Sequence, residues 1–161
     1  MILRIKEEQK IALMKITSVI ILALCIMYIW GNSLEDADMS GQKSGKVTEF
    51  VNDVLPKNQP VTEQFLRKAA HFAEYFVEGV CVVFAAYAFG MFTAGNIGSG
   101  LLIGVVTALI DETIQIKSPG RASSVIDIWI DWAGFVVGAV VLIGIIALVK
   151  AKFNRMDLSK K

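Results

Sequence analysis

Eight polar or charged side chains lie within or beside long apolar segments of this sequence, where ionisable groups are energetically costly and mark functional sites. The set consists of His71, Glu74, Asp111, Glu112, Gln115, Arg121, Asp127 and Asp131. Most neighbours within one segment are three or four residues apart, as His71 and Glu74 are, and this spacing places them on one face of a helix. An imidazole beside carboxylates can act as a general base or hold a divalent cation. A guanidinium can bind a phosphate or a carboxylate through two parallel hydrogen bonds.

Carboxylates outnumber basic partners in this set, since five acids face one histidine and one arginine. Some of these acids must therefore be protonated, bound to a metal ion or paired with a ligand. Structural roles compete with function for individual residues, because Asp127 could cap a helix N-terminus and Arg121 could form a salt bridge that locks a bundle. A purely structural role is harder to sustain for the whole set, so we predict a functional polar pocket.

The elements that would position these residues are membrane-spanning helices. Hydrophobic residues make up 55% of the 161-residue chain and charged residues only 19%, whereas soluble domains are ~25% charged. The apolar residues form four blocks, each long enough to cross a hydrocarbon core of ~30 Å. The predicted spans are residues 11–30, 69–92, 97–116 and 128–149. This pattern predicts an all-α integral membrane bundle in one domain over residues 1–161, and it excludes a soluble globule and a disordered chain.

The first block also has the lysines in front of it that a signal peptide would have. However, Trp30-Gly31-Asn32-Ser33 offers no small-x-small cleavage site, and the block is long for the apolar region of a signal peptide. We therefore predict a retained membrane helix.

Basic residues indicate how the spans are oriented. The two tails carry nine basic and three acidic residues, whereas the loops on the other side, residues 31–68 and 117–127, carry seven of each. Because basic residues favour cytoplasmic segments, both termini are predicted to be cytoplasmic. The eight polar residues then lie within roughly 8 Å of the outer helix ends, so the pocket is predicted to open to the outer leaflet.

The long outer loop, residues 31–68, contains a further amphipathic pattern. Its apolar residues recur at the spacing of one helix face: Val47, Phe50, Val51, Val54 and Leu55. The pattern predicts a short helix that ends at Pro56 and lies on the membrane surface or caps the bundle. Residues 32–45 are rich in Ser, Gly and Asp and are predicted to be irregular. Thr62 followed by Glu63 predicts the helix start that leads into the second span.

Small residues four apart predict faces where helices approach closely and leave homo-oligomerisation open. The pairs are Gly100 with Gly104, Gly134 with Gly138 and, more weakly, Ala86 with Gly90. Cys25 and Cys81 are predicted to be buried free thiols, since no Cys-x-x-Cys pair exists. A net charge of +1 argues against a nucleic-acid partner.

Two motifs resemble the VanZ-like family of bacterial membrane proteins over about residues 32–138. The first is Arg67-Lys68-x-x-His71-Phe72-x-Glu74-Tyr75. The second joins Asp111-Glu112-x-x-Gln115 to Pro119-Gly120-Arg121-x-Ser123, Asp127 and Asp131-x-x-Gly134. Ser33, Ser40 and Ser44 resemble the Ser-rich stretch that often precedes the motifs, and Ile116-Lys117-Ser118 departs from the more apolar or aromatic family pattern.

The resemblance implies a multi-pass protein of the bacterial plasma membrane, from a family whose founding member is linked to resistance to teicoplanin-type glycopeptide antibiotics. It carries the eight polar residues over as a pocket without assigning their roles.

Three functions follow as hypotheses. The protein protects the cell envelope, through a pocket that binds a lipid-linked cell-wall precursor or a glycopeptide-related ligand. Alternatively, it is an intramembrane enzyme acting on a lipid-linked envelope substrate, with His71 as a base oriented by Glu74, or with the aspartates and Glu112 holding a divalent cation. The third hypothesis is a non-catalytic scaffold of envelope synthesis.

Overall fold

The computed structural model describes residues 2–55, 60–91, 94–121 and 123–158. Over these residues the chain forms five α-helices and no strand: α1 (Ile2–Ser33), α2 (Ala37–Val54), α3 (Glu63–Ala88), α4 (Ala94–Lys117) and α5 (Val125–Leu158). All except α2 contain a segment that is long and apolar enough to cross a membrane. The prediction of an all-α bundle with four such helices is therefore confirmed.

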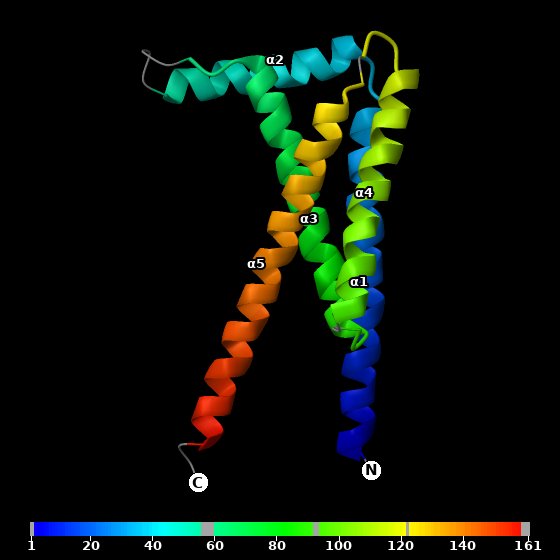
Figure 1. Ribbon diagram of the computed structural model, residues 1–161, viewed down its shortest axis with the longest axis vertical. Helices are drawn as coiled ribbons and strands as arrows, with labels where there is room; N and C mark the ends of the chain where they lie inside the picture. The colour runs from blue at the N-terminus through cyan, green and yellow to red at the C-terminus, as the bar shows by residue number, and fades with distance from the viewer. Residues whose placement is uncertain (1, 56–59, 92–93, 122, 159–161) are drawn as a thin grey trace.

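The four long helices run along the long axis of the molecule, whereas α2 lies across one end of the bundle (Figure 1). Helix α1 begins and α5 ends at the opposite end, where the two helices lie apart from each other. Helix α3 contacts each of the other long helices and packs most extensively against α5. The loop between α4 and α5 and the junction of α1 with α2 both lie at the α2 end (Figure 1).

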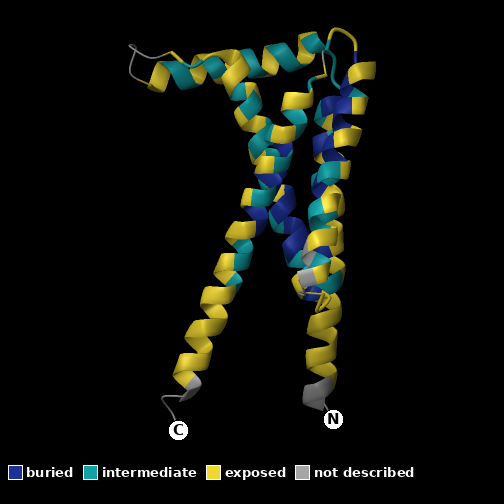
Figure 2. Cartoon of the chain, viewed as in Figure 1, coloured by how far each residue is buried: buried dark blue, intermediate teal, exposed yellow. Residues whose placement is uncertain are grey.

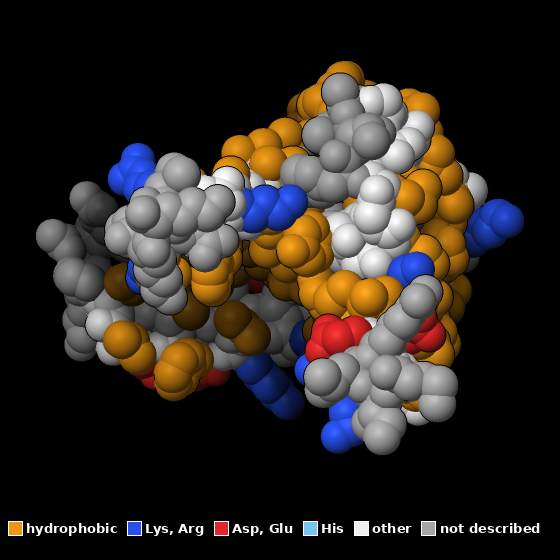
Figure 3. Space-filling view, turned by 90° about the horizontal axis from the view of Figure 1, so that it is seen from below, with side chains coloured by type: hydrophobic (Ala, Val, Ile, Leu, Met, Phe, Trp, Pro, Cys, Tyr) orange, Lys and Arg blue, Asp and Glu red, His pale blue; other side chains and the backbone are white. Residues whose placement is uncertain are grey.

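Buried residues concentrate where the four long helices meet, and the ends of α1 and α5 near the termini are exposed (Figure 2). The apolar core takes Ile29 from α1, Tyr75 and Val82 from α3, Ala108 from α4 and Phe135 from α5. Apolar side chains also cover much of the surface seen from the end that carries the termini (Figure 3). An exposed apolar surface of this extent is expected of helices that face lipid.

Glycines allow α3 and α5 to approach closely. A Cβ at Gly134 would lie 3.0 Å from the carbonyl carbon of Phe72, and one at Gly138 would lie 2.8 Å from that of Phe76. Gly79 on α3 returns the contact, because its Cβ would lie 2.9 Å from the carbonyl carbon of Phe135. The predicted packing role of the Gly134 and Gly138 pair is thus confirmed, and Gly79 is an additional member.

The other small-residue pairs differ from this one. A Cβ at Gly104 would lie 2.7 Å from ring carbons of Phe135, whereas one at Gly100 would only touch Val82, at 3.6 Å. The prediction that Ala86 and Gly90 form a face of close helix approach is wrong for Gly90. Gly90 follows the end of α3 with φ +68°, a left-handed conformation that suits glycine, and no atom lies within 4 Å of its Cβ position.

The predicted boundaries need correction because hydropathy marks the membrane-crossing window and not the helix. Helix α1 begins at Ile2 and not at residue 11, since its charged first turns continue the helix. Helix α3 begins at Glu63, six residues before the predicted start, and Thr62 caps it as expected, accepting a hydrogen bond from Phe65 N at 3.2 Å. Helix α3 ends at Ala88, whereas the predicted end at residue 92 lies outside the described residues.

The prediction that residues 32–45 are irregular is wrong for most of that stretch, since α2 begins at Ala37. Asp36 caps the helix by accepting a hydrogen bond from Met39 N at 2.8 Å. Within the helix, the Ser44 hydroxyl donates to the Ser40 carbonyl at 3.0 Å, so this polar side chain is satisfied without leaving the helix. The predicted end is close, because α2 stops at Val54, although Pro56 lies outside the described residues.

The two cysteines are free, as predicted, but only Cys81 is buried, while Cys25 is partly exposed.

Candidate functional site

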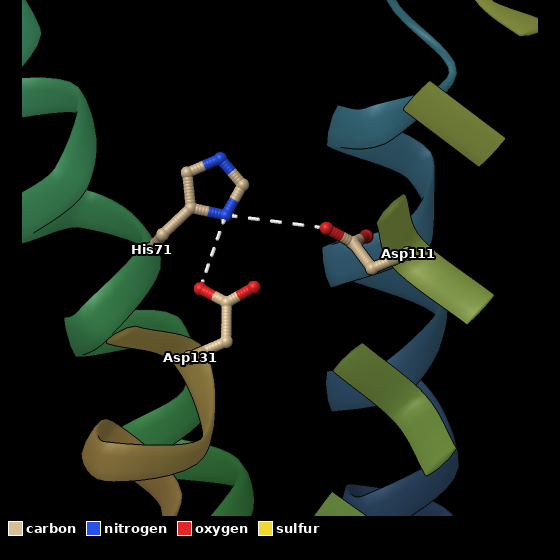
Figure 4. Close-up of side chains that lie close together, drawn as sticks. All are labelled: His71, Asp111 and Asp131. Atoms are coloured by element: carbon tan, nitrogen blue, oxygen red, sulfur yellow. Dashed lines mark ion pairs between the residues drawn. The ribbon is translucent and has the colours of Figure 1, made fainter. Parts of the chain in front are cut away.

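Three of the predicted site residues meet between three helices. His71 comes from α3, Asp111 from α4 and Asp131 from α5. The imidazole Nδ1 of His71 lies 3.6 Å from Asp131 Oδ1 and 4.0 Å from Asp111 Oδ2 (Figure 4). Both aspartates have an exposed fraction of 0%, and one ligand atom from each of the three residues lies within 4.8 Å of the others. We call these three residues the His–Asp cluster.

Several polar atoms of the His–Asp cluster are buried without a hydrogen bond. They are both carboxylate oxygens of Asp131, Oδ1 of Asp111 and Nδ1 of His71, for which the described part of the chain provides no partner within hydrogen-bond geometry. Two buried carboxylates beside one imidazole need protons, a cation or a polar ligand to offset their charge. The cluster is therefore chemically incomplete as it stands.

Asp111 has a support that fixes its orientation. Gln115, one turn further along α4, donates from Nε2 to Asp111 Oδ2 at 2.9 Å and to the hydroxyl of Ser33 at 3.3 Å. The Ser118 hydroxyl in turn donates to the Ser33 carbonyl at 2.8 Å. The end of α1 thus belongs to the site. Neither Ser33 nor Ser118 was among the predicted site residues. The sequence placed Ser33 in a Ser-rich stretch and Ser118 in a segment that departs from the family pattern.

Asn32 joins two further predicted site residues. Its Nδ2 donates to Glu74 Oε1 at 2.8 Å, and its carbonyl accepts a hydrogen bond from a terminal nitrogen of Arg121 at 3.0 Å. Burial lowers the pKa of Arg121, and the nearby Arg67 lowers it further, but a guanidinium keeps its positive charge under these conditions. Sequence reasoning missed Asn32, although its position at the polar end of an apolar helix is the signal that could have indicated it.

Glu112 and Asp127 form contacts of a structural kind. Glu112 Oε2 accepts a hydrogen bond from Ser124 N at 2.9 Å in the loop before α5. Asp127 Oδ1 lies 3.2 Å from Lys68 Nζ on α3. The alternative role of Asp127 as the cap of α5 does not hold: Asp127 lies in the first turn, while Ser124 precedes the helix and accepts from Ile126 N at 3.2 Å. A carboxylate in the first turn still favours the helix dipole.

A cavity of about 270 Å³ adjoins the His–Asp cluster at the α2 end of the bundle. Its lining comes from α1, α2, α3 and the loop between α4 and α5, and it includes the polar residues Asn32, Lys43, Arg67, His71, Glu74 and Arg121. Lys43 is paired with Glu35, which also lines the cavity. The cavity therefore combines the basic side chains of Arg67 and Arg121 with the carboxylates of Glu35 and Glu74, and His71 connects it to the His–Asp cluster.

A further buried carboxylate lies deeper in the bundle. Glu78 has an exposed fraction of 0% and accepts a hydrogen bond from the Thr107 hydroxyl at 3.2 Å. It shares the α3 face with His71 and Glu74, but it is absent from the cavity lining and from the His–Asp cluster.

Comparisons with known proteins support one assignment. No curated protein and no solved structure matches the chain significantly. The sequence model of the VanZ/LLP1 family matches residues 18–148, which include the end of α1, the whole of α2 to α4 and most of α5. Because this match covers most of the chain and every residue of the site, the protein belongs to the VanZ/LLP1 family.

Proposed function

We propose that this protein protects the bacterial cell envelope against teicoplanin-type glycopeptides by binding the anionic headgroup of a lipid-linked envelope precursor. The cavity beneath α2 carries this proposal, because it brings Arg67, Arg121 and His71 into one space between membrane-spanning helices. The antibiotic class follows from the resemblance to the VanZ-like family, and the ligand chemistry follows from the lining.

The size and position of the cavity support a headgroup ligand. Drug-sized ligands occupy pockets of ~300–1,000 Å³, so a cavity of about 270 Å³ suits a phosphate and part of a sugar but not a whole glycolipid. The acyl chains of such a lipid would stay in the membrane beside the bundle. Arg121 and Arg67 would bind the phosphate through charge-assisted hydrogen bonds.

The proposed location is the plasma membrane, with both termini in the cytoplasm and the cavity at the outer leaflet. Basic residues of the tails support this orientation, and the termini lie at the end opposite to α2. The exposed apolar residues Phe50 and Val54 of α2, each 70% exposed, suit a helix lying in the outer interface.

Glycopeptide susceptibility tests this function. A sensitive Gram-positive host would express the wild type, Asp111→Asn or Glu78→Gln, with membrane abundance matched by immunoblot. Glu78→Gln is the matched control, because it makes the same carboxylate-to-amide change at an equally buried site outside the His–Asp cluster. We expect the wild type and Glu78→Gln to raise the inhibitory concentration of teicoplanin, and Asp111→Asn to lose most of that increase.

Two outcomes would contradict the proposal. If Asp111→Asn protects as well as the wild type at equal abundance, the site is not the mechanism and a scaffold role is favoured. If the wild type gives no protection, envelope protection against this antibiotic class is wrong for this protein.

The His–Asp cluster favours a second candidate function, an intramembrane enzyme acting on a lipid-linked sugar or phospholipid. The base would be His71, but its carboxylate neighbour in the structure is Asp131 at 3.6 Å, whereas Glu74 bonds to Asn32. Assaying the purified protein with radiolabelled lipid-linked precursors tests this candidate. Turnover by the wild type that is lost in His71→Gln would support it, and the absence of turnover with every such lipid would contradict it.

A further inference from the structure

We propose that His71 Nδ1 and the carboxylates of Asp111 and Asp131 form a binding site for a divalent cation of the zinc type between α3, α4 and α5. This inference goes beyond the proposed function, because it concerns what the cluster binds whether or not the cavity above it takes an envelope lipid.

The spacing of the three donors fits a tetrahedral cation. Zinc binds imidazole nitrogen and carboxylate oxygen at ~2.0–2.2 Å, which places two ligands of a tetrahedron ~3.4 Å apart. His71 Nδ1 is 3.6 Å from Asp131 Oδ1 and 4.0 Å from Asp111 Oδ2. Side-chain movements of well under 1 Å would close both distances to the tetrahedral value. Both distances from His71 Nδ1 exceed hydrogen-bond length, so hydrogen bonds from the imidazole do not explain the convergence.

Unsatisfied buried atoms are the second observation. Asp131 is fully buried, and neither of its oxygens has a hydrogen-bond partner in the described residues. Burying a carboxylate in this way is strongly unfavourable unless a cation or a proton compensates its charge. Two carboxylates and a neutral imidazole carry a charge of −2, which one divalent cation neutralises. Figure 4 shows the imidazole and both carboxylates turned toward one another.

The surroundings have the features of a metal site. Gln115 donates to Asp111 Oδ2 at 2.9 Å and is itself in contact with Ser33, so the carboxylate is held in place by an outer layer of hydrogen bonds. Three protein ligands leave a fourth position free, as in zinc sites that bind a water or a substrate. His71 also lines the cavity, so the site adjoins the space where a ligand would enter.

The ligand types select among cations. Imidazole suits Zn²⁺, Fe²⁺ and related transition ions, whereas Mg²⁺ prefers six oxygen ligands in an octahedron and keeps several waters. We therefore expect Zn²⁺ to bind more tightly than Mg²⁺.

Direct measurement of bound metal tests the site. The protein, purified in detergent with a tag that contains no histidine, would be stripped with a chelator, incubated with Zn²⁺ or Mg²⁺, freed of unbound ions and assayed by mass spectrometry of the metal. We expect about one Zn²⁺ per chain in the wild type and in the Glu78→Gln control, and little Mg²⁺ in either. His71→Gln and Asp131→Asn should each lose most of the Zn²⁺. Gln115→Ala, which removes only the positioning hydrogen bonds, should weaken Zn²⁺ binding by roughly 10–100-fold.

Thermal unfolding shows whether a variant lacks Zn²⁺ because it has lost the site or because it is misfolded. With the chelator present, Asp131→Asn should unfold at or above the wild-type temperature, because it removes a buried charge. Addition of Zn²⁺ should raise the unfolding temperature of the wild type and Glu78→Gln only. Equal Zn²⁺ content in the wild type and Asp131→Asn, or a wild type that binds none after loading, would overturn the inference. Neither result depends on protection against an antibiotic.

Discussion

The contact between α3 and α5 gives a sharp test of the fold, because one glycine substitution has no room there. In Gly138→Ala, the new Cβ would lie 2.8 Å from the carbonyl carbon of Phe76 and 3.0 Å from its Cα. Carbon atoms in contact are normally ~3.5–4.0 Å apart, so the two helices must separate by ~0.7–1.2 Å. Overpacking of this kind costs ~1–3 kcal/mol, and the better helix propensity of alanine offsets up to ~1 kcal/mol. We expect a net loss of about 1–2 kcal/mol in the free energy of unfolding.

The matched control lies on the same helix. Gly144 has no atom within 4 Å of its Cβ position, so Gly144→Ala should leave stability unchanged or raise it by up to ~1 kcal/mol. Unfolding in mixed detergent micelles with increasing dodecyl sulfate measures both variants, followed by the fluorescence of the three tryptophans, Trp30 on α1 and Trp129 and Trp132 on α5. If Gly138→Ala unfolds at the same detergent fraction as Gly144→Ala, the close approach of α3 and α5 is wrong.

Two further predictions concern the site and its orientation. Arg121→Lys should reduce protection against teicoplanin at unchanged abundance, because a point charge replaces a planar fork for the headgroup phosphate; full protection by this variant would argue against such a contact. Ser123→Cys, in a background without the two native cysteines, should react with a membrane-impermeant thiol reagent added to intact cells, whereas Asn154→Cys should react only after lysis; the reverse result would invert the proposed orientation.

Much of the bundle could be predicted because the lipid environment imposes a strong pattern on the sequence. A helix that crosses a hydrocarbon core must satisfy its own backbone and carry an apolar surface, so the four spans are evident without any tertiary information. The same pattern does not define the helix ends. The first turns of α1 and α3 carry charged residues such as Lys6 and Glu63, which hydropathy assigns to loops although the helix continues through them.

The grouping of site residues could be predicted only in part. Helix periodicity and the direction of each span predict that His71, Asp111 and Asp131 lie at one depth. The structure brings ligand atoms of these three residues within 4.8 Å of one another. The prediction could not separate these residues from Glu112, which bonds to the backbone of Ser124. It also missed Asn32, because its two partners come from α3 and the loop before α5, and such contacts depend on packing.

The connections at the α2 end explain how the cavity and the His–Asp cluster are held in a fixed relation. Ala37 N, at the start of α2, donates to the Pro119 carbonyl at 3.0 Å, and the neighbouring Gly120 has φ +72°. Its Cβ position is only 3.0 Å from Ala37 Cβ, so a larger residue would be strained and crowded there.

The end of α1 links the two parts of the site. The Asn32 carbonyl accepts from Arg121 in the cavity wall, and the next residue, Ser33, supports Gln115 beneath Asp111. A headgroup phosphate that draws Arg121 away from Asn32 therefore acts on the same backbone segment that supports the cation ligand. For this reason, we expect Ser33→Ala to weaken Zn²⁺ binding although it removes no metal ligand, and unchanged Zn²⁺ affinity in that variant would show that the cluster is positioned by α4 alone.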